Sequence, residues 1–390
     1  MRRVMLIAVM ALVTFGVIAC RDGASSEGQG DGVDETVGGR DTSADSDDGG
    51  GEVGALDTGR DTRTDGEEVS PDGGSTASLC DQIGRGSNAD LAGRRLFPEA
   101  FYWYQSVEDA PVDPNSDALI ASIGADTGLH ADFGCCWMGT FGIPYTVVDE
   151  STPEVPVDFR YADESDPGPY PIPADAPIEG GASATGDRHV LAVDCADRTL
   201  YEIFDAHPQS DGSWEAGSGV AWDLDEEPIR QPYCTSADAA GLPILPGLAR
   251  YDEIEAGEID HALRFTVEQT RQAFVRPPAS HWASDQTDPN LPPMGMRVRL
   301  KSDAELKAAG VPVDSFDEQV EILVDAMQTY GLIVADNGSD WYVSGMPHEG
   351  WDDDQLVNQL GQIEGRHFEV IEMENVVGDR SVGAGSCELD

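Results

Sequence analysis

The segment His189-Val190-Leu191-Ala192-Val193-Asp194 carries the residue pattern that decides the fold of this chain. Its side chains alternate with a period of two, as they do in a β-strand. Similar short segments, bounded by Gly, Pro, Asp or Asn, recur at residues 155–161, 199–205, 219–224, 259–267 and 296–300. We therefore predict a mainly β (α+β) fold: an antiparallel β-sandwich or jelly-roll-like domain with a few short helices packed on it.

Three helix starts can be identified in the C-terminal part of the chain, after the last of these segments. Ser315 and Glu318 form a capping box, and an apolar stripe follows them until Gly331. Shorter helices are expected to begin at Ser302 and Asp352. All three helices should pack their apolar faces against a sheet.

A β-hairpin is predicted directly after the longest helix. Residues 332–335 and 341–343 are apolar or aromatic, and Asp336-Asn337-Gly338-Ser339-Asp340 lies between them. An Asn-Gly pair in such a position is typical of a turn between two paired strands. We therefore expect these two strands to hydrogen-bond to each other.

The first 19 residues predict export. Arg2 and Arg3 precede an apolar stretch that is too short for a comfortable membrane span but suits a signal peptide. Residues 17–20 read Val-Ile-Ala-Cys, which resembles the lipobox of bacterial lipoproteins. The resemblance implies a lipidated Cys20, attached to membrane lipid in the bacterial cell envelope and facing the periplasm or the cell surface. The alternative is an ordinary signal peptide with a chance cysteine.

Residues 21–79 have the composition of a disordered tether. They contain no aromatic residue, and 4 Arg stand against 16 acidic residues. Low hydrophobicity and like-charge repulsion prevent such a segment from building a core. With Cys20 it forms a predicted linker over residues 20–79. No Pro/Gly-rich break divides the remainder, so we predict one globular domain over residues 80–390.

Six cysteines remain once Cys20 is assigned to lipid. An exported chain meets an oxidising compartment, so we predict up to three disulfides. Cys80 and Cys387 flank the predicted domain and are candidates to join its ends. The adjacent Cys135 and Cys136 are expected to have separate partners. Zinc binding is the alternative, but no Cys-x-x-Cys spacing supports it.

The chain of 390 residues has a net charge of −51. This charge makes phosphate backbones and anionic lipid surfaces poor partners, so we expect no nucleic-acid binding. A net charge of −41 falls in residues 80–390, which contain only two lysines. Solubility in a saline habitat explains so acidic a surface, and carboxylate clusters that hold Ca²⁺ are the alternative explanation.

Five segments of the predicted domain form a recognisable set: ADESDPGPYPIP (162–173), DRH (187–189), GLPILPG (241–247), IDHALRF (259–265) and DNG (336–338). Together they resemble an uncharacterised family of exported bacterial proteins. The resemblance covers roughly residues 110–372 and implies one globular unit but no particular activity. Gly134-Cys135-Cys136-Trp137-Met138 departs from the family pattern, so its cysteines are interpreted as a local addition.

The absence of several well-known catalytic motifs from the sequence reduces the number of possible functions. The sequence contains no Gly-x-Ser-x-Gly elbow, His-Glu-x-x-His pair, phosphate loop or dinucleotide glycine pattern, so hydride, kinase and zinc-protease chemistry lose support. Carboxylates, histidines and aromatic rings remain, and these are the groups with which proteins handle sugars. We therefore expect an action on carbohydrate, as a glycan hydrolase or lyase.

The catalytic candidates are acids and a histidine on strands and on the hairpin turn: Glu202, Asp223, His261 and Asp336. The mechanism needs one protonated acid or His as proton donor and a second carboxylate as base or nucleophile. His261 lies in phase with the apolar residues of its strand, so a buried structural histidine is the competing interpretation. We predict that all four share one concave site.

Candidates for substrate binding lie on the same strands and at the hairpin: His189, Trp222, Arg264, Asn337 and Trp341. Aromatic rings among them would stack on sugar rings, and polar groups would bind hydroxyls. Trp222 and His189 are in phase with apolar neighbours, so inward packing is the alternative for both.

A Pro-bounded loop carries Asp163, Glu164 and Asp166, which are candidate ligands for Ca²⁺. Solvated turn acids are the alternative, because the EF-hand register is missing. Two rivals to an enzyme remain: a non-catalytic carbohydrate-binding protein and a structural envelope lipoprotein. A binder needs exposed aromatic faces, whereas a hydrolase needs two acids about 5 to 10 Å apart.

Overall fold

The computed structural model describes residues 78–135 and 141–378. The chain divides into two units, Met1–Pro71 and Asp72–Asp390, and all described residues lie in the second. Cys20 and the predicted tether up to residue 77 lie outside the described residues. Within the described ranges, no helix has the length and apolar character needed to cross a membrane.

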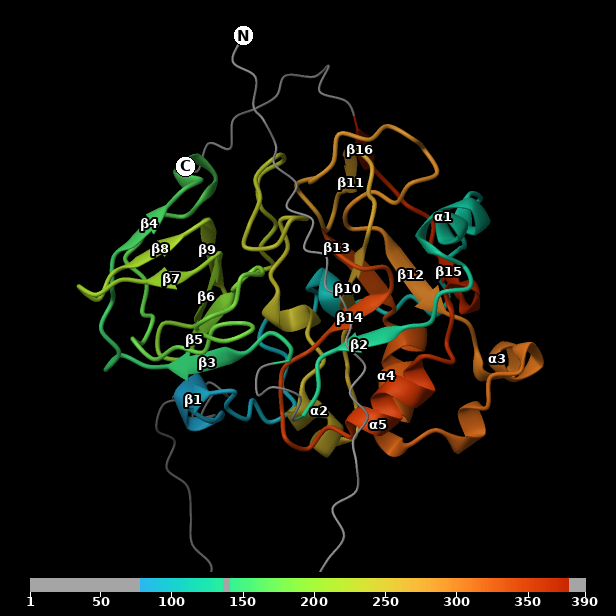
Figure 1. The fold of residues 1–390 in the computed structure, drawn as a ribbon, viewed down its shortest axis with the longest axis horizontal. Coiled ribbons are helices and arrows are strands. Elements are labelled where there is room, and N and C mark those ends of the chain that lie inside the picture. Colours follow the sequence, from blue (N-terminus) through green and yellow to red (C-terminus); the bar gives the residue numbers. More distant parts are fainter. Residues whose placement is uncertain (1–77, 136–140, 379–390) are drawn as a thin grey trace, which may run out of the picture. The chain divides into compact units, whose positions relative to one another are not determined.

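One sheet has five strands in the order β1-β3-β5-β6-β9 (Figure 1). The β3–β5 pair is parallel, and the other three pairs are antiparallel. β5 is buried along its whole length, which explains why its residues are nearly all apolar. The strands are β1 (Gly86–Ser87), β3 (Tyr145–Val148), β5 (Val190–Asp194), β6 (Thr199–Phe204) and β9 (Ser218–Asp223).

A second sheet has six strands in the order β15-β12-β13-β10-β14-β2 (Figure 1). Two of its pairs, β10–β13 and β14–β2, are parallel. The strands are β2 (His130–Asp132), β10 (Leu263–Val267), β12 (Arg297–Leu300), β13 (Leu332–Asn337), β14 (Tyr342–Ser344) and β15 (Phe368–Val370).

Smaller elements complete the described part of the chain. A three-stranded sheet joins β4 (Val157–Phe159), β8 (Trp214–Ala216) and β7 (His207–Pro208), and a two-stranded sheet joins β11 (Ala273–Val275) and β16 (Val376–Gly378). The α-helices are α1 (Ser116–Ile123), α2 (Tyr251–Ala256), α3 (Asp303–Ala309), α4 (Glu318–Thr329) and α5 (Asp353–Gln355), the last continuing as the π-helical turn Leu356–Leu360. Short 3₁₀ helices span Leu79–Asp81, Tyr102–Tyr104, Ala162–Glu164, Leu245–Gly247, Val313–Ser315 and Gly365–His367.

The predicted fold class is confirmed at the coarse level: the structure is rich in sheet and has a few short helices. The expectation of purely antiparallel sheets is corrected, because both large sheets contain parallel pairs. Parallel neighbours need long connections, and these run through the loops and short helices between the strands. The finer expectation of a sandwich or jelly roll stays a prediction.

The predicted hairpin between residues 332 and 343 is not formed. β13 and β14 both pair with β10 and not with each other, so β10 lies between them (Figure 1). β10 runs parallel to β13 and antiparallel to β14. A strand that occurs far earlier in the sequence has therefore taken the position that a local hairpin would have occupied.

All three predicted helices form, but one of them has a different cap residue from the one predicted. Ser302 and Glu305 form the capping box of α3, and Asp352 caps α5. The cap of α4 is Asp317, whose carboxylate accepts a hydrogen bond from the backbone N–H of Gln319, whereas Ser315 lies in a preceding 3₁₀ turn. α4 ends before Gly331, whose φ of 75° allows the chain to turn into β13.

One large hydrophobic core draws residues from both large sheets. Leu191 of β5 and Trp222 of β9 belong to the same buried cluster as Phe265 of β10. Cys80 and Cys195 form a disulfide, so Cys80 is not joined to Cys387 as expected from their flanking positions. Cys135 and Cys234 each take part in a disulfide as well.

Candidate functional site

A shift in register between β10 and β13 changes the face of the sheet to which the side chain of Asp336 points. The strands pair residue for residue up to Phe265, but Thr266 lies opposite Asp336, so Ala335 is left over as a bulge. Residues opposite each other in a sheet point to the same face, and alternate residues such as Arg264 and Thr266 share a face. The bulge therefore brings Asp336 onto the face of Arg264.

This face continues across β14 and β2 as a polar surface. Ser344 lies opposite Asp132, and Arg264 Nη1 donates a hydrogen bond to Ser344 Oγ at 2.7 Å. Two residues earlier on each strand, Tyr342 lies opposite His130. Because alternate residues point the same way, one face of three adjacent strands carries these polar and aromatic side chains.

Asp238 faces Arg264 from the loop between β9 and β10. Arg264 Nη2 lies 3.0 Å from Asp238 Oδ1, and Arg264 Nε lies 3.4 Å from Asp238 Oδ2. Asp238 is 0% exposed and Arg264 is 3% exposed. Ser236 Oγ accepts a hydrogen bond from the backbone N–H of Asp238 at 2.9 Å and fixes the loop. The result is a buried ion pair whose members depend on each other.

His189, directly before β5, contacts two hydrogen-bond acceptors. Its Nδ1 lies 2.6 Å from Glu179 Oε2, and its Nε2 lies 3.1 Å from the carbonyl oxygen of Ala237. Since both partners accept, both ring nitrogens donate and the ring is a cation. Burial lowers the pKa of His189, but the Glu179 carboxylate outweighs burial and raises the pKa to about 9.

Two carboxyl groups on the polar face have raised pKa values. Burial, together with the charges of Asp238 and Asp187, raises the pKa of Asp336 to about 7. Burial, together with Glu179 and Asp187, raises the pKa of Asp132 to about 6. Negative charge thus exceeds positive charge locally, which favours the protonated form of these two groups. We name the whole group the Arg264 cluster: Asp132, Glu179, Asp187, His189, Asp238, Arg264 and Asp336.

The residues of the Arg264 cluster differ in how far their side chains are exposed to solvent. Arg264, His189 and Asp238 are buried. Asp132 and Asp336 are half-buried, and the side chain of Glu179 is 25% exposed. Asp187 is exposed. A ligand that approaches from solvent therefore meets carboxyl groups, while the two cations lie beneath them.

Aromatic rings lie beside the half-buried acids. The ring centroids of His130 and Tyr342 are 4.1 Å apart, and those of His130 and Phe141 are 6.4 Å apart. Phe141 is 39% exposed, and the other two rings are half-buried. Burial lowers the pKa of His130, which favours its neutral ring. These rings provide apolar surface next to polar groups, as ligand sites commonly do.

Of the residues predicted from sequence, the structure brings Asp336, Arg264 and His189 together. Asn337 follows Asp336 but its side chain contacts the neighbouring segment: its Nδ2 donates to the carbonyl oxygens of Val267 and Glu268, and its Oδ1 accepts from Thr270. Asn337 therefore holds the end of β13 in place.

Glu202 and Trp222 form a buried structural pair. Glu202 is 0% exposed, and its carboxylate accepts hydrogen bonds from Trp222 Nε1 at 2.9 Å and from the backbone N–H groups of Ile244 and Leu245. Trp222 is 2% exposed. The pair thus anchors the 3₁₀ helix Leu245–Gly247 to the five-stranded sheet and offers no surface to a ligand.

His261 belongs to another buried network. Its Nε2 lies 2.9 Å from Glu253 Oε1, and its Nδ1 lies 2.7 Å from the carbonyl oxygen of Ala262. Arg250 Nη2 lies 2.7 Å from the same Glu253 oxygen. His261 is 1% exposed, so the structural interpretation fits it better than a catalytic one.

Asp223 and Trp341 also lie apart from the Arg264 cluster. Asp223 is an exposed residue at the end of β9, where its carboxylate accepts from the backbone N–H of Asp225. Trp341 is 0% exposed and stacks between Phe265 and Phe368 at centroid distances of 5.4 and 5.1 Å. The four catalytic candidates therefore have four different surroundings rather than one shared site.

The predicted calcium loop does not assemble a metal site. Asp163 is exposed, and Asp166 Oδ1 forms an ion pair with Arg230 Nη1 at 2.7 Å. The carbonyl oxygen of Glu164 accepts a hydrogen bond from Arg230 Nη2. Within the described parts of the chain, no group of three or more His, Cys, Asp or Glu side chains is arranged to hold a metal ion.

Sequence reasoning missed Asp132, Glu179, Asp187 and Asp238. Asp187 could have been predicted, because it lies two residues before His189 in one of the segments that carry the family resemblance. Glu179 and Asp238 lie in irregular segments, where no periodicity indicates the direction of a side chain. Only the folded chain brings these loops to the face of β10.

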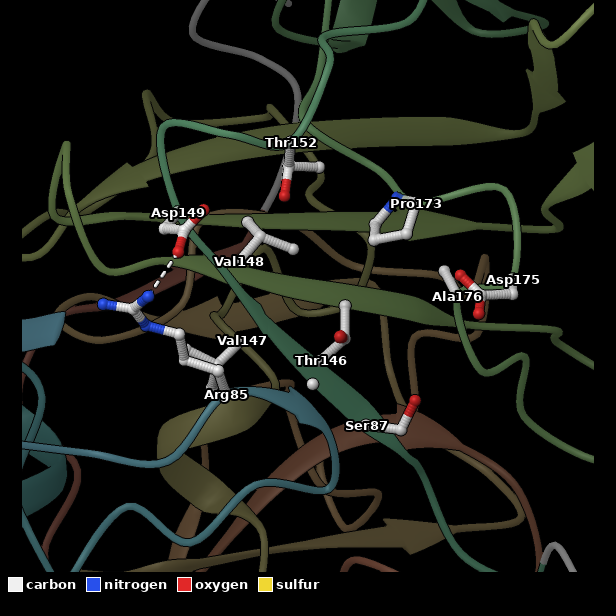
Figure 2. A pocket seen from close by; sticks show the side chains of 11 residues that line it. Arg85, Ser87, Thr146, Val147, Val148, Asp149, Thr152, Pro173, Asp175 and Ala176 are labelled. Atoms are coloured by element: carbon white, nitrogen blue, oxygen red, sulfur yellow. Dashed lines mark hydrogen bonds and ion pairs between the residues drawn. The ribbon is translucent and has the colours of Figure 1, made fainter.

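Two cavities lie elsewhere. One of about 370 Å³ is bounded by β1, β3 and the loop at Pro173 (Figure 2), where Arg85 Nη1 donates to Asp149 Oδ2 at 2.6 Å. A second, of about 210 Å³, is lined by Arg160, Asp205 and His207 among others. Neither is lined by residues of the Arg264 cluster.

Comparison with known proteins yields no relative: no family model, curated protein or solved structure matches the chain. The function must therefore be inferred from the arrangement of side chains. The Arg264 cluster is the strongest basis, because it combines paired carboxyl groups, raised pKa values and adjacent aromatic rings.

Proposed function

We propose that the chain is a lipid-anchored protein of the bacterial cell envelope that acts on carbohydrate at the Arg264 cluster, as a glycan hydrolase or lyase. The observation that carries the proposal is Asp336, a half-buried carboxyl group with its pKa raised to about 7 by burial, Asp238 and Asp187. Such a group keeps its proton near neutral pH and is able to protonate a glycosidic oxygen.

Asp187 supplies the second carboxyl group in this mechanism. It is exposed, and its charge acts on both Asp336 and Asp132, so it lies near both. We assign it as the base or nucleophile, and Asp336 as the proton donor. The buried Arg264–Asp238 pair and the His189–Glu179 pair, in which the Glu179 side chain is 25% exposed, hold the strands of the site to the neighbouring loops.

A non-catalytic carbohydrate-binding protein is the second candidate. The exposed ring of Phe141, with His130 and Tyr342 beside it, favours this candidate. Aromatic surface next to hydrogen-bonding groups is sufficient for sugar binding without any proton transfer. The two candidates share one site and differ in whether a bond is broken.

The lipid anchor rests on the sequence. Residues 17–20 resemble a lipobox, and residues 21–79 have the composition of a flexible linker. A domain held in this way would reach polysaccharide near the membrane while staying attached to the cell.

A panel of bacterial and algal polysaccharides tests the proposal. The purified full chain should release reducing ends, or unsaturated sugar ends for a lyase, from at least one of them. Asp336→Asn should lower this turnover by about 100-fold or more, whereas Asp117→Asn, at an exposed position of α1, should not change it. Binding without turnover would favour the second candidate. The absence of both binding and turnover across the panel would contradict both.

A further inference from the structure

The cavity of about 370 Å³ lies at the edge of the five-stranded sheet, where β1 pairs with β3 (Figure 2). Tyr145 and Val147 of β3 point into the large core, so Thr146 and Val148 point to the opposite face of the sheet. On that face a second hydrophobic cluster covers the neighbouring strands, for example at Val190 of β5, but it includes neither Thr146 nor Val148. The cavity lies where this second cluster ends.

Thr146 is a buried polar side chain that lines this cavity. It is 3% exposed, and its hydroxyl makes no hydrogen bond to any residue that the structure describes. Burying a hydroxyl without a partner costs free energy, so such groups are normally paired. Ser87 lies opposite Thr146 in the β1–β3 pair and therefore on the same face, and Thr152 adds a third hydroxyl from the loop after β3. A polar ligand would supply the partner that Thr146 lacks.

An ion pair and a separate carboxylate lie at opposite ends of the cavity (Figure 2). At one end Arg85 Nη1 donates to Asp149 Oδ2 at 2.6 Å, whereas Arg85 Nε and Nη2 have no partner within residues 78–135 and 141–378. The Arg85 side chain is 51% exposed, so a ligand can reach these N–H groups. Asp175 lies at the other end and is exposed. The cavity thus offers hydrogen-bond donors and acceptors side by side.

We propose that this cavity binds one neutral sugar ring of a glycan, as a site separate from the Arg264 cluster. Every sugar hydroxyl both donates and accepts hydrogen bonds, which matches a lining of carboxylates that accept, a guanidinium that donates and hydroxyls that do both. Val148 and Pro173 add apolar surface for the carbon skeleton of the ring. The volume is at the lower end of the range for small-molecule sites, which is about 300–1,000 Å³.

Other classes of ligand fit the cavity less well. An anionic group would meet Asp149 and Asp175, while the only cation among the described lining residues, Arg85, is already paired. A cationic group would find only Asp175 unpaired, and an exposed ion pair of this kind contributes little. A nucleobase would find no ring to stack on, because none of the described residues that line the cavity is aromatic. The inference goes beyond the proposed function, because sugar binding here requires no bond cleavage.

Methyl glycosides of glucose, galactose and mannose test the ligand class, and the methyl glycoside of glucuronic acid is the charged control. Calorimetric titration of the full chain with millimolar sugar, at about 0.15 M salt, should detect binding of at least one neutral glycoside. The glucuronic acid derivative should bind at least about tenfold more weakly than that neutral glycoside, because its carboxylate approaches Asp149 and Asp175. If no neutral glycoside binds, or if the charged control binds equally well or better, the inference is overturned.

Thr146→Val keeps the size of the side chain and removes the hydroxyl. Because this hydroxyl has no partner in the described part of the chain, the variant should unfold at the same or a higher temperature. It should bind the neutral glycoside about threefold to tenfold more weakly. Thr329→Val, at the half-buried last position of α4, is the matched control and should leave the affinity unchanged. Unchanged affinity in Thr146→Val, or an equal loss in Thr329→Val, would contradict the proposed site.

Arg85→Gln removes the spare N–H donors at one end of the cavity. The Arg85–Asp149 pair is largely exposed on the arginine side, so its loss should cost little stability. Binding of the neutral glycoside should fall about tenfold. Arg198→Gln breaks the exposed pair with Asp225 instead and should leave binding unchanged. Binding that Arg85→Gln does not affect would mean that the sugar lies elsewhere, and the inference would be wrong.

Failure of this inference differs from failure of the proposed function. Asp336→Asn, in the Arg264 cluster, should leave the affinity of the cavity unchanged. Sugar binding that is lost in Asp336→Asn and retained in Thr146→Val would refute the cavity site alone. Sugar binding that depends on Thr146, without turnover of any polysaccharide, would support the cavity site and count against a hydrolase or lyase.

Discussion

Arg264 Nη2 lies 3.0 Å from Asp238 Oδ1, and this buried ion pair joins β10 to the loop that follows β9. The pair ties together the two large sheets at the place where the half-buried acids gather. Its geometry explains why a strand in the middle of the six-stranded sheet carries a charged residue, since the charge is matched from the facing loop.

Breaking this ion pair should destabilise the fold strongly. Asp238→Asn leaves the Arg264 guanidinium buried without its counter-charge, and we expect a loss of about 3–5 kcal/mol in the free energy of unfolding. Denaturant unfolding measures it. Asp225→Asn, which breaks the exposed pair with Arg198, is the control and should leave the stability nearly unchanged. Similar small losses in both variants would show that the Arg264–Asp238 pair is not structurally important.

The raised pKa of Asp336 predicts a pH dependence of stability. The folded chain holds a proton on Asp336 up to about pH 7, whereas the unfolded chain releases it near its ordinary value of 3.8. The contribution of Asp336 to stability should therefore fall as the pH rises from about 4 to about 7. Asp336→Asn removes this term, so the variant should gain about 1–2 kcal/mol relative to the unaltered protein at pH 8, a figure reduced because the group is only half-buried, and gain little at pH 4. Thermal unfolding at both pH values measures the difference, and an equal gain at both would contradict the assignment.

Turnover should depend on pH through the same group. If Asp336 donates the proton, kcat/KM falls as the pH rises through about 7, because the group loses its proton there. The measured value belongs to the coupled acids of the cluster and not to Asp336 alone. A rate that stays constant from pH 6 to pH 9 would contradict Asp336 as proton donor.

Glu202→Gln distinguishes a structural role from a catalytic one. The amide cannot accept every hydrogen bond that Glu202 receives from Trp222, Ile244 and Leu245, so at least one N–H group is left without a partner. We expect a loss of about 1–3 kcal/mol in stability and unchanged glycan binding. Full stability with abolished turnover would return Glu202 to the catalytic candidates.

Cys20→Ser tests the anchor. The variant should appear in the soluble fraction of the cell, because it lacks the thiol that receives lipid. The unaltered protein should remain with the membrane, and mass spectrometry should find an acylated Cys20 at its N-terminus. A Cys20→Ser protein that stays membrane-bound although its signal segment has been removed, and so through no other anchor, would refute lipidation at this residue.

The local elements could be predicted from the sequence because they depend on local patterns. The period-two segment at 189–194 became β5, and the Ser302–Glu305 capping box marked α3. Pairing could not be predicted in the same way. The Asp336-Asn337-Gly338 segment has the composition of a hairpin turn, yet β10 lies between the strands on its two sides.

The site was predictable only in part for the same reason. Arg264 stood out as a polar residue in an apolar strand and Asp336 as an acid in the predicted hairpin turn, but the sequence gives no sign of the bulge at Ala335 that turns Asp336 toward Arg264. Trp341 was expected at a ligand-facing tip and instead stacks in the core between Phe265 and Phe368. Polarity identified candidates, but burial and long-range pairing decided which of them meet.

Hydrogen–deuterium exchange with a bound glycan tests most directly whether the Arg264 cluster is the carbohydrate site. The full chain should be measured with and without the panel glycan that it binds most tightly. Slower exchange is expected in the segments at residues 130–132, 186–190 and 336–344, which carry Asp132, Asp187 and Asp336 and the rings of His130 and Tyr342. Protection confined to β1, β3 and the loop at Pro173, around the cavity beside Arg85, would contradict the assignment of the site.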